Sequence, residues 1–128
     1  MSHLYTLRQV HKLPLPIETT WNFFADASNL LIVNPPHLDL KIDTDIEGEV
    51  QPGQFINFKM KPMLGIGVSW VSKITHVERY KLFVDEQVTG PFGFWQHQHH
   101  FKEVDGGTEV TDLIYYKMPF RNLGELAA

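Results

Sequence analysis

The sequence predicts an α+β domain in which a large, curved antiparallel sheet is accompanied by two short helices. Three observations lead to this prediction. Segments that alternate between apolar and polar residues recur along most of the chain, turn-forming residues separate them at short intervals, and helical spacing is confined to a region near the start. Short connections make antiparallel neighbours, and the apolar face of such a sheet needs a cover.

Residues 1–33 predict one strand and two short helices. Residues 3–12 alternate moderately and are expected to form the strand. Pro16 suits the first turn of a helix, and three apolar residues with helical spacing follow it: Ile17, Trp21 and Phe24. Ser28 is expected to cap a second helical turn that ends before the prolines at positions 35 and 36.

Six further strands are predicted from residue 38 onward. They cover residues 38–45, 54–61, 68–77, 82–89, 94–104 and 109–118. Glycine, proline or Asp-Gly signals bound each of them, as in the stretches 90–93 and 105–107. Together with the first strand they make a seven-stranded sheet, and little sequence remains for the helix that would cover it.

Length, composition and charge exclude several classes of protein. The 128 residues weigh 14.8 kDa and fit a single domain, residues 1–128, while 43% hydrophobic content excludes a disordered chain. The absence of cysteine excludes disulfides and thiol chemistry, and fits a reducing, cytoplasmic location. A net charge of −4 argues against nucleic acid as a partner, and no apolar run is long enough for membrane insertion or export.

Alternation assigns the more apolar side of each strand to the inner face of the sheet. This face comprises Ile56, Phe58, Met60, Val68, Trp70, Ser72, Ile74, Val84, Glu86, Val88, Trp95, His97, His99, Phe101, Val110, Asp112, Ile114 and Tyr116. Glu86, His97, His99 and Asp112 interrupt it with polar groups. Because an unpaired charge would be expensive there, these four side chains are expected to contact one another.

Hairpin geometry tests whether these four polar side chains lie close enough to contact one another. A four-residue loop over residues 90–93 places Glu86 opposite His97. A two-residue turn at residues 105–106 places His99 opposite Asp112, whereas a turn at 106–107 places Phe101 there. Both registers leave two carboxylates beside two imidazoles. The direction of a histidine pKa shift stays open, because a carboxylate raises that pKa and burial lowers it.

Several segments carry a resemblance to a known superfamily. They are Trp70-Val-Ser-Lys-Ile-Thr-His-Val-Glu78, Phe83-Val-Asp-Glu-Gln87, Gly90-Pro-Phe-Gly-Phe-Trp-Gln-His-Gln-His-His-Phe101 and Asp105-Gly-Gly-Thr-Glu-Val-Thr-Asp112, with Trp21-Asn-Phe-Phe24 nearer the start. They resemble the SRPBCC superfamily of START-like, helix-grip proteins, and most of all its small bacterial ligand-binding members labelled polyketide cyclase-like. The resemblance covers nearly the whole chain, from about Leu4 to Ala127.

The resemblance implies a helix-grip fold, in which a seven-stranded antiparallel sheet wraps around a long C-terminal helix with a hydrophobic cavity between them. The positions implied to line or border this cavity are Phe58, Trp70, Glu86, Trp95, His97, His99, Phe101, Asp112 and Tyr116. Similar proteins continue past Leu126 into the long helix, so that helix is expected to be truncated or missing here. A second subunit is one candidate for covering the sheet, which makes a homodimer an expected arrangement.

The function favoured by these residues is binding of a hydrophobic small molecule, lipid-like or aromatic, without a cofactor. A ring with a carbonyl or hydroxyl group would stack on Trp70 or Trp95 and hydrogen-bond to His97, His99 or Tyr116.

Three other interpretations use the same residues. A cyclase or dehydratase would use His97 or His99 as a general base beside Glu86 or Asp112. A metal or dimerisation module is a further alternative, with the two histidines and Glu86 as a two-histidine, one-carboxylate set, although no metal is predicted. In the third interpretation the four residues only satisfy one another within a packed core.

Overall fold

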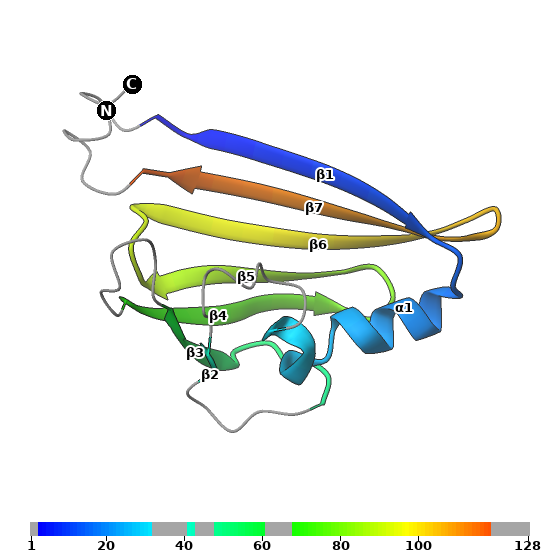
Figure 1. The fold of residues 1–128 in the computed structure, drawn as a ribbon, viewed down its shortest axis with the longest axis horizontal. Coiled ribbons are helices and arrows are strands. Elements are labelled where there is room, and N and C mark those ends of the chain that lie inside the picture. The colour runs from blue at the N-terminus through cyan, green and yellow to red at the C-terminus, as the bar shows by residue number, and fades with distance from the viewer. Residues whose placement is uncertain (1–2, 32–40, 43–47, 61–67, 119–128) are drawn as a thin grey trace.

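The computed structural model of the chain describes residues 3–31, 41–42, 48–60 and 68–118. Its elements are β1 (Tyr5–Leu13), α1 (Ile17–Phe24), the 3-10 helix η1 (Ala27–Leu31), β2 (Lys41–Ile42), β3 (Phe55–Met60), β4 (Val68–Glu78), β5 (Leu82–Thr89), β6 (Phe94–Val104) and β7 (Gly107–Lys117) (Figure 1). The predicted α+β class and seven strands are confirmed, and the second helical segment is a 3-10 helix.

The strands form one antiparallel sheet in the order β1-β7-β6-β5-β4-β3-β2. Strands β2 to β7 follow one another in the chain, whereas β1 pairs with β7 and so forms one edge of the sheet. The pairing of β4 with β5 shifts register between Val71 and Ser72 and again between Ile74 and His76. Irregularities of this kind bend a strand and increase its twist.

Most predicted boundaries hold, with one correction in the described residues. The predicted strands at 82–89 and 94–104 coincide with β5 and β6. The prediction that Ser28 caps η1 is wrong, because Asp26 is the capping residue. The Asp26 carboxylate accepts hydrogen bonds from the Ser28 N–H at 2.9 Å and from the Ser28 hydroxyl at 2.6 Å. The rest of the strand predicted at 38–45, the C-terminal helix and the side chains of Met60 and Val68 lie outside the described residues.

Helix α1 lies at one end of the sheet (Figure 1). Its Trp21 side chain is fully buried. Pro16 precedes the helix with φ −60°, so the chain enters it with the torsion that proline imposes. The Trp21 ring meets Phe101 at 5.0 Å and Phe83 at 5.9 Å, edge to face in both cases. Neither helix in the described part of the chain has the length and apolar content that a membrane crossing needs.

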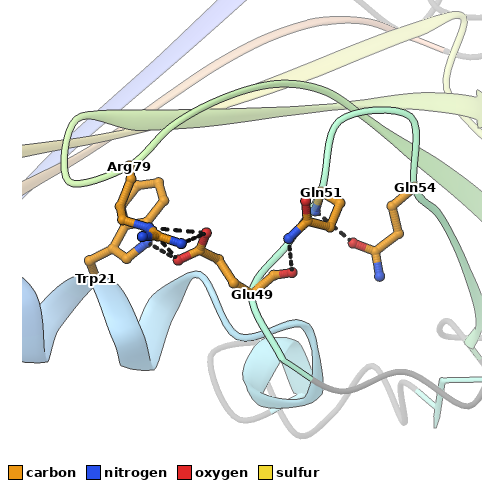
Figure 2. A network of polar contacts seen from close by, with 5 residues as sticks. All are labelled: Trp21, Glu49, Gln51, Gln54 and Arg79. Atoms are coloured by element: carbon orange, nitrogen blue, oxygen red, sulfur yellow. Dashed lines mark hydrogen bonds and ion pairs between the residues drawn. The ribbon is translucent and has the colours of Figure 1, made fainter.

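Glu49 connects the helix to the turn between β4 and β5 (Figure 2). The Trp21 indole N–H donates to one Glu49 oxygen at 3.0 Å, and the Arg79 guanidinium donates to both oxygens at 3.1–3.3 Å. The bond from Arg79 contributes most to a Glu49 pKa below the ordinary value of 4.5. A buried indole N–H needs an acceptor, so Glu49 makes the burial of Trp21 possible.

We predict that Glu49→Ala lowers the free energy of unfolding by about 1–3 kcal/mol, because it leaves the buried indole N–H without an acceptor. Glu49→Gln should lose less, since its amide oxygen still accepts. Because the pKa of Glu49 is depressed in the folded protein, the difference between wild type and Glu49→Gln should be present at neutral pH and shrink as the pH falls below 4.5.

Urea denaturation followed by circular dichroism measures both effects. Glu103→Ala, which removes an exposed glutamate from β6, is the matched control and should change stability by less than about 0.5 kcal/mol. Equal stability of Glu49→Ala and wild type at neutral pH would show that this contact does not support the fold.

Candidate functional site

The register between β5 and β6 differs by one residue from the prediction. Asp85 pairs with His97, and Glu86 pairs with Gln96. Side chains alternate along a strand, so Asp85 shares the inner face with the histidines and Glu86 lies on the opposite face. There the Gln96 amide donates to Glu86 at 3.4 Å. The predicted Glu86–His97 contact is therefore wrong.

The reason for this shift is a side-chain bridge inside the connecting loop. The Gln87 amide donates to the Phe92 carbonyl at 2.7 Å and accepts from the Phe92 N–H at 3.1 Å. Gln87 closes the loop in this way, and the loop holds one residue more than the tight connection that was assumed. Phe83, which is 1% exposed, consequently lies on the inner face of β5. Val88, which was predicted there, is 55% exposed.

The register between β6 and β7 follows one of the two predicted alternatives. Val104 pairs with Gly107 around a two-residue turn, and His99 pairs with Asp112. Gly106 has φ +80°, in the left-handed region that glycine adopts without steric cost. The pairing across β5, β6 and β7 thus brings Asp85, His97, His99 and Asp112 together on the inner face, and we call these four residues the His–Asp cluster.

Each histidine of the His–Asp cluster is hydrogen-bonded to a carboxylate. His97 Nε2 donates to Asp112 Oδ1 at 2.8 Å, and His99 Nε2 donates to Asp85 Oδ2 at 2.7 Å. The second ring nitrogen of His99, Nδ1, lies 3.6 Å from Asp112 Oδ1. Asp112 therefore faces both imidazoles from β7, and Asp85 faces one of them from β5.

Stacking fixes the orientation of the two imidazole rings. The His99 ring lies between the ring of Phe83, 4.0 Å away between centroids and nearly parallel, and the ring of His97, 3.7 Å away. Only 11% of the His99 side chain is exposed, against 21% for His97. Within the cluster, His99 is therefore the buried histidine and His97 is the one nearer to solvent.

Burial and neighbouring charge set the ionisation of the cluster. Burial lowers the pKa of His99 and the charge of His97 adds to this, so the bond to Asp85 does not restore its ordinary value. Burial raises the pKa of Asp112, but the bond from His97 and the charges of both imidazoles outweigh it, leaving that pKa below the ordinary 3.8. Neutral His99 and anionic Asp112 are the favoured forms near neutral pH.

Four aromatic residues gather farther along the inner face, away from α1. We call Trp70, Phe92, Trp95 and Tyr116 the aromatic group. The Trp95 ring lies 4.8 Å from Phe92, 5.1 Å from Trp70 and 5.8 Å from Tyr116. All four side chains are partly buried rather than enclosed, so each offers apolar surface to a further molecule.

The other predicted site residues have different surroundings. Phe101 is 5% exposed and packs on Trp21 and Phe24 in the core, and Phe58 is partly buried against that core. Two residues of the site were missed by the sequence analysis. Asp85 would have been found by counting one more loop residue, whereas Phe92 lies in a loop, where alternation gives no signal.

We predict that Asp85→Ala lowers the free energy of unfolding by about 1–3 kcal/mol, because the buried His99 N–H loses its acceptor. The neighbouring change Glu86→Ala removes a longer carboxylate from the opposite face and should cost less than about 0.5 kcal/mol. Urea denaturation in the presence of a chelator compares the two variants. If Glu86→Ala were the more damaging substitution, the register described above would be incorrect.

Comparisons with known proteins identify the fold. No protein-family model matches the chain, and no curated protein matches it. Protein CV1439 from Chromobacterium violaceum is similar in structure, with a TM-score of 0.69 and 12% identity over 90% of this chain and 81% of that one. Ara h 8.0201 has a TM-score of 0.66 and 14% identity, covering 91% and 79% of the two chains.

A further similar structure is major latex-like protein 151 from Panax ginseng, with a TM-score of 0.65 and 12% identity over 90% of this chain and 80% of that one. Ara h 8.0201 and the ginseng protein are members of the SRPBCC superfamily. At these identities the likeness establishes the fold alone. The chain shares the START-like, helix-grip fold of these structures, as the sequence resemblance implied.

Proposed function

We propose that this protein binds a hydrophobic small molecule that carries an aromatic ring and a hydrogen-bonding oxygen. The observation that carries this proposal is the position of the aromatic group directly beside the more exposed histidine of the His–Asp cluster. Trp95 and His97 are two residues apart on the same face of β6. That spacing corresponds to about 6.6 Å along the strand, which is the scale of a fused ring system with one substituent.

The chemistry of the two groups is complementary to such a molecule. The partly exposed rings of Trp70, Trp95 and Tyr116 provide apolar surface for stacking. His97 is held in place by Asp112 and keeps 21% of its side chain exposed, so it can exchange a hydrogen bond with a carbonyl or hydroxyl oxygen. Binding sites for small molecules combine a mostly apolar wall with a few positioned polar groups in this manner.

The fold supports the same proposal. Its neighbours belong to a superfamily of ligand-binding proteins. The sequence resemblance implies a hydrophobic cavity between the sheet and the C-terminal helix. Our proposal places this cavity on the inner side of the sheet, bordered by the aromatic group and His97. Fold likeness does not identify the ligand, so the argument for an oxygen-bearing aromatic molecule rests on the residues above.

Isothermal titration calorimetry with 2-naphthol and naphthalene tests this function. We predict saturable binding of both molecules, with 2-naphthol bound more tightly because its hydroxyl meets His97. Trp95→Ala should weaken 2-naphthol binding by about tenfold, which corresponds to about 1.4 kcal/mol. His97→Phe should remove the preference for 2-naphthol over naphthalene while leaving naphthalene bound.

Phe55→Ala is the matched control, because Phe55 is 50% exposed on the outer side of β3 and contacts the Lys73 ammonium instead of the aromatic group. It should bind 2-naphthol as the wild type does. The proposal is wrong if neither probe binds, or if Trp95→Ala binds 2-naphthol with unchanged affinity.

A further inference from the structure

The His–Asp cluster also contains the donor atoms of a cation site. Asp85, His97 and His99 each offer one ligand atom, and these atoms lie within 4.8 Å of one another. In a tetrahedral zinc site with bonds of about 2.0–2.2 Å, neighbouring ligand atoms stand ~3.4 Å apart. Side-chain rotations that move these atoms by about an ångström would therefore bring all three to one ion.

Hydrogen bonding within the cluster leaves lone pairs facing one another. Since the Nε2–H of neutral His99 donates to Asp85, its Nδ1 carries a lone pair, and this nitrogen lies 3.6 Å from Asp112 Oδ1. Two acceptors that face each other at this distance are unfavourable, and the contact is relieved when an ion binds His99 at Nε2 and the ring proton moves to Nδ1, where it points toward Asp112.

The framework of the cluster is rigid. Asp85 and the two histidines lie on β5 and β6, which pair directly, and Asp112 lies opposite His99 on β7. The stack of Phe83, His99 and His97 fixes the ring planes. Strand pairing and neighbouring contacts of this kind restrict the movement that ion binding needs to small side-chain rotations.

The donor types select the class of ion. Two imidazole nitrogens with carboxylate oxygens suit borderline divalent ions such as Zn²⁺, Co²⁺ and Ni²⁺, whereas Ca²⁺ and Mg²⁺ prefer oxygen ligands alone. Two aspartates beside two imidazoles also offset the charge of a divalent ion. The bond from His97 to Asp112 is the kind of contact that orients a ligating histidine and raises its basicity.

We propose that Asp85, His97 and His99 bind a divalent cation of the zinc class, with Asp112 orienting His97 from the neighbouring strand. This site goes beyond the binding of an organic ligand and does not depend on it. An ion between Asp85 and His99 would take the place of the proton that now joins them. Because a coordinated neutral imidazole keeps one N–H, that proton would move to His99 Nδ1, which lies 3.6 Å from Asp112 Oδ1.

Calorimetric titration of the full-length, chelator-treated protein with Zn²⁺ tests this proposal, and the visible spectrum of added Co²⁺ provides a second readout. We expect saturable binding of a single ion per chain and a higher melting temperature, because the ion binds the folded state. His97→Gln and His99→Gln should abolish saturable binding of both ions. Asp112→Asn should weaken Zn²⁺ binding by about 10- to 100-fold.

Two matched controls make the result specific. His100→Gln changes a histidine of the same strand that contacts Gln98 on the opposite face, and His76→Gln removes an exposed histidine beside Glu78. Both variants should bind Zn²⁺ as the wild type does. Should His99→Gln fail to fold, His97→Gln carries the same test, because His97 is the more exposed of the two.

The proposal is overturned if the wild type shows no saturable binding of Zn²⁺ or Co²⁺, if that binding survives in His97→Gln, or if it is lost in His76→Gln or His100→Gln. Trp95→Ala separates this site from the proposed function. It should retain full Zn²⁺ affinity even though it binds 2-naphthol weakly, so the failure of either proposal is distinguishable from failure of the other.

Discussion

The pairing of β5, β6 and β7 is the constraint on which the candidate site depends. Strand register changes only in whole residues, and a slip of one residue moves every side chain to the other face. In the observed register Asp85 faces the histidines, and a single slip would replace it with Glu86. Two local features set this register: the Gln87–Phe92 bridge at one end of the hairpins and the turn at Gly106 at the other.

A polar cluster between packed aromatic rings is stable only when its members satisfy one another. Burying a polar group without a hydrogen bond costs about 1–3 kcal/mol in protein mutational data. Among the described residues that are not exposed, every buried side-chain nitrogen and oxygen has a hydrogen-bond partner. The His–Asp cluster meets this requirement with one carboxylate for each imidazole. The face of the His99 ring, which is buried away from water, packs on the Phe83 ring.

Local patterns predicted the strands well, and side-chain contacts that alternation does not reveal account for what they missed. Alternation and turn residues were sufficient for β5 and β6 and narrowed the β6–β7 register to two alternatives, because these features depend on residues close together in the chain. The face of β5 was misassigned because Val84 is apolar and only 8% exposed, although it lies on the outer side. An apolar residue can therefore be buried on either face of the sheet, so the more apolar face of a strand is not always the inner one.

The contact between Glu49 and Trp21 shows the limit of sequence patterns most clearly. These residues are 28 positions apart, and Arg79 lies 30 positions beyond Glu49. No periodicity links residues so far apart, and an isolated glutamate is ordinarily exposed. The contact is nevertheless what lets Trp21 pack edge-on against Phe83, on which the buried histidine stacks.

Exposure increases along this series of rings, from 0% for Trp21 and 1% for Phe83 to 11% and 21% for the side chains of His99 and His97. Along the inner face, a buried core at the α1 end is thus followed by the hydrogen-bonded His–Asp cluster and then by the partly exposed rings of the aromatic group. His97, the more exposed histidine, is oriented by its stacking on His99, which in turn stacks on the buried Phe83 ring. This arrangement explains how His97 can remain accessible to a ligand or an ion and still occupy a defined position.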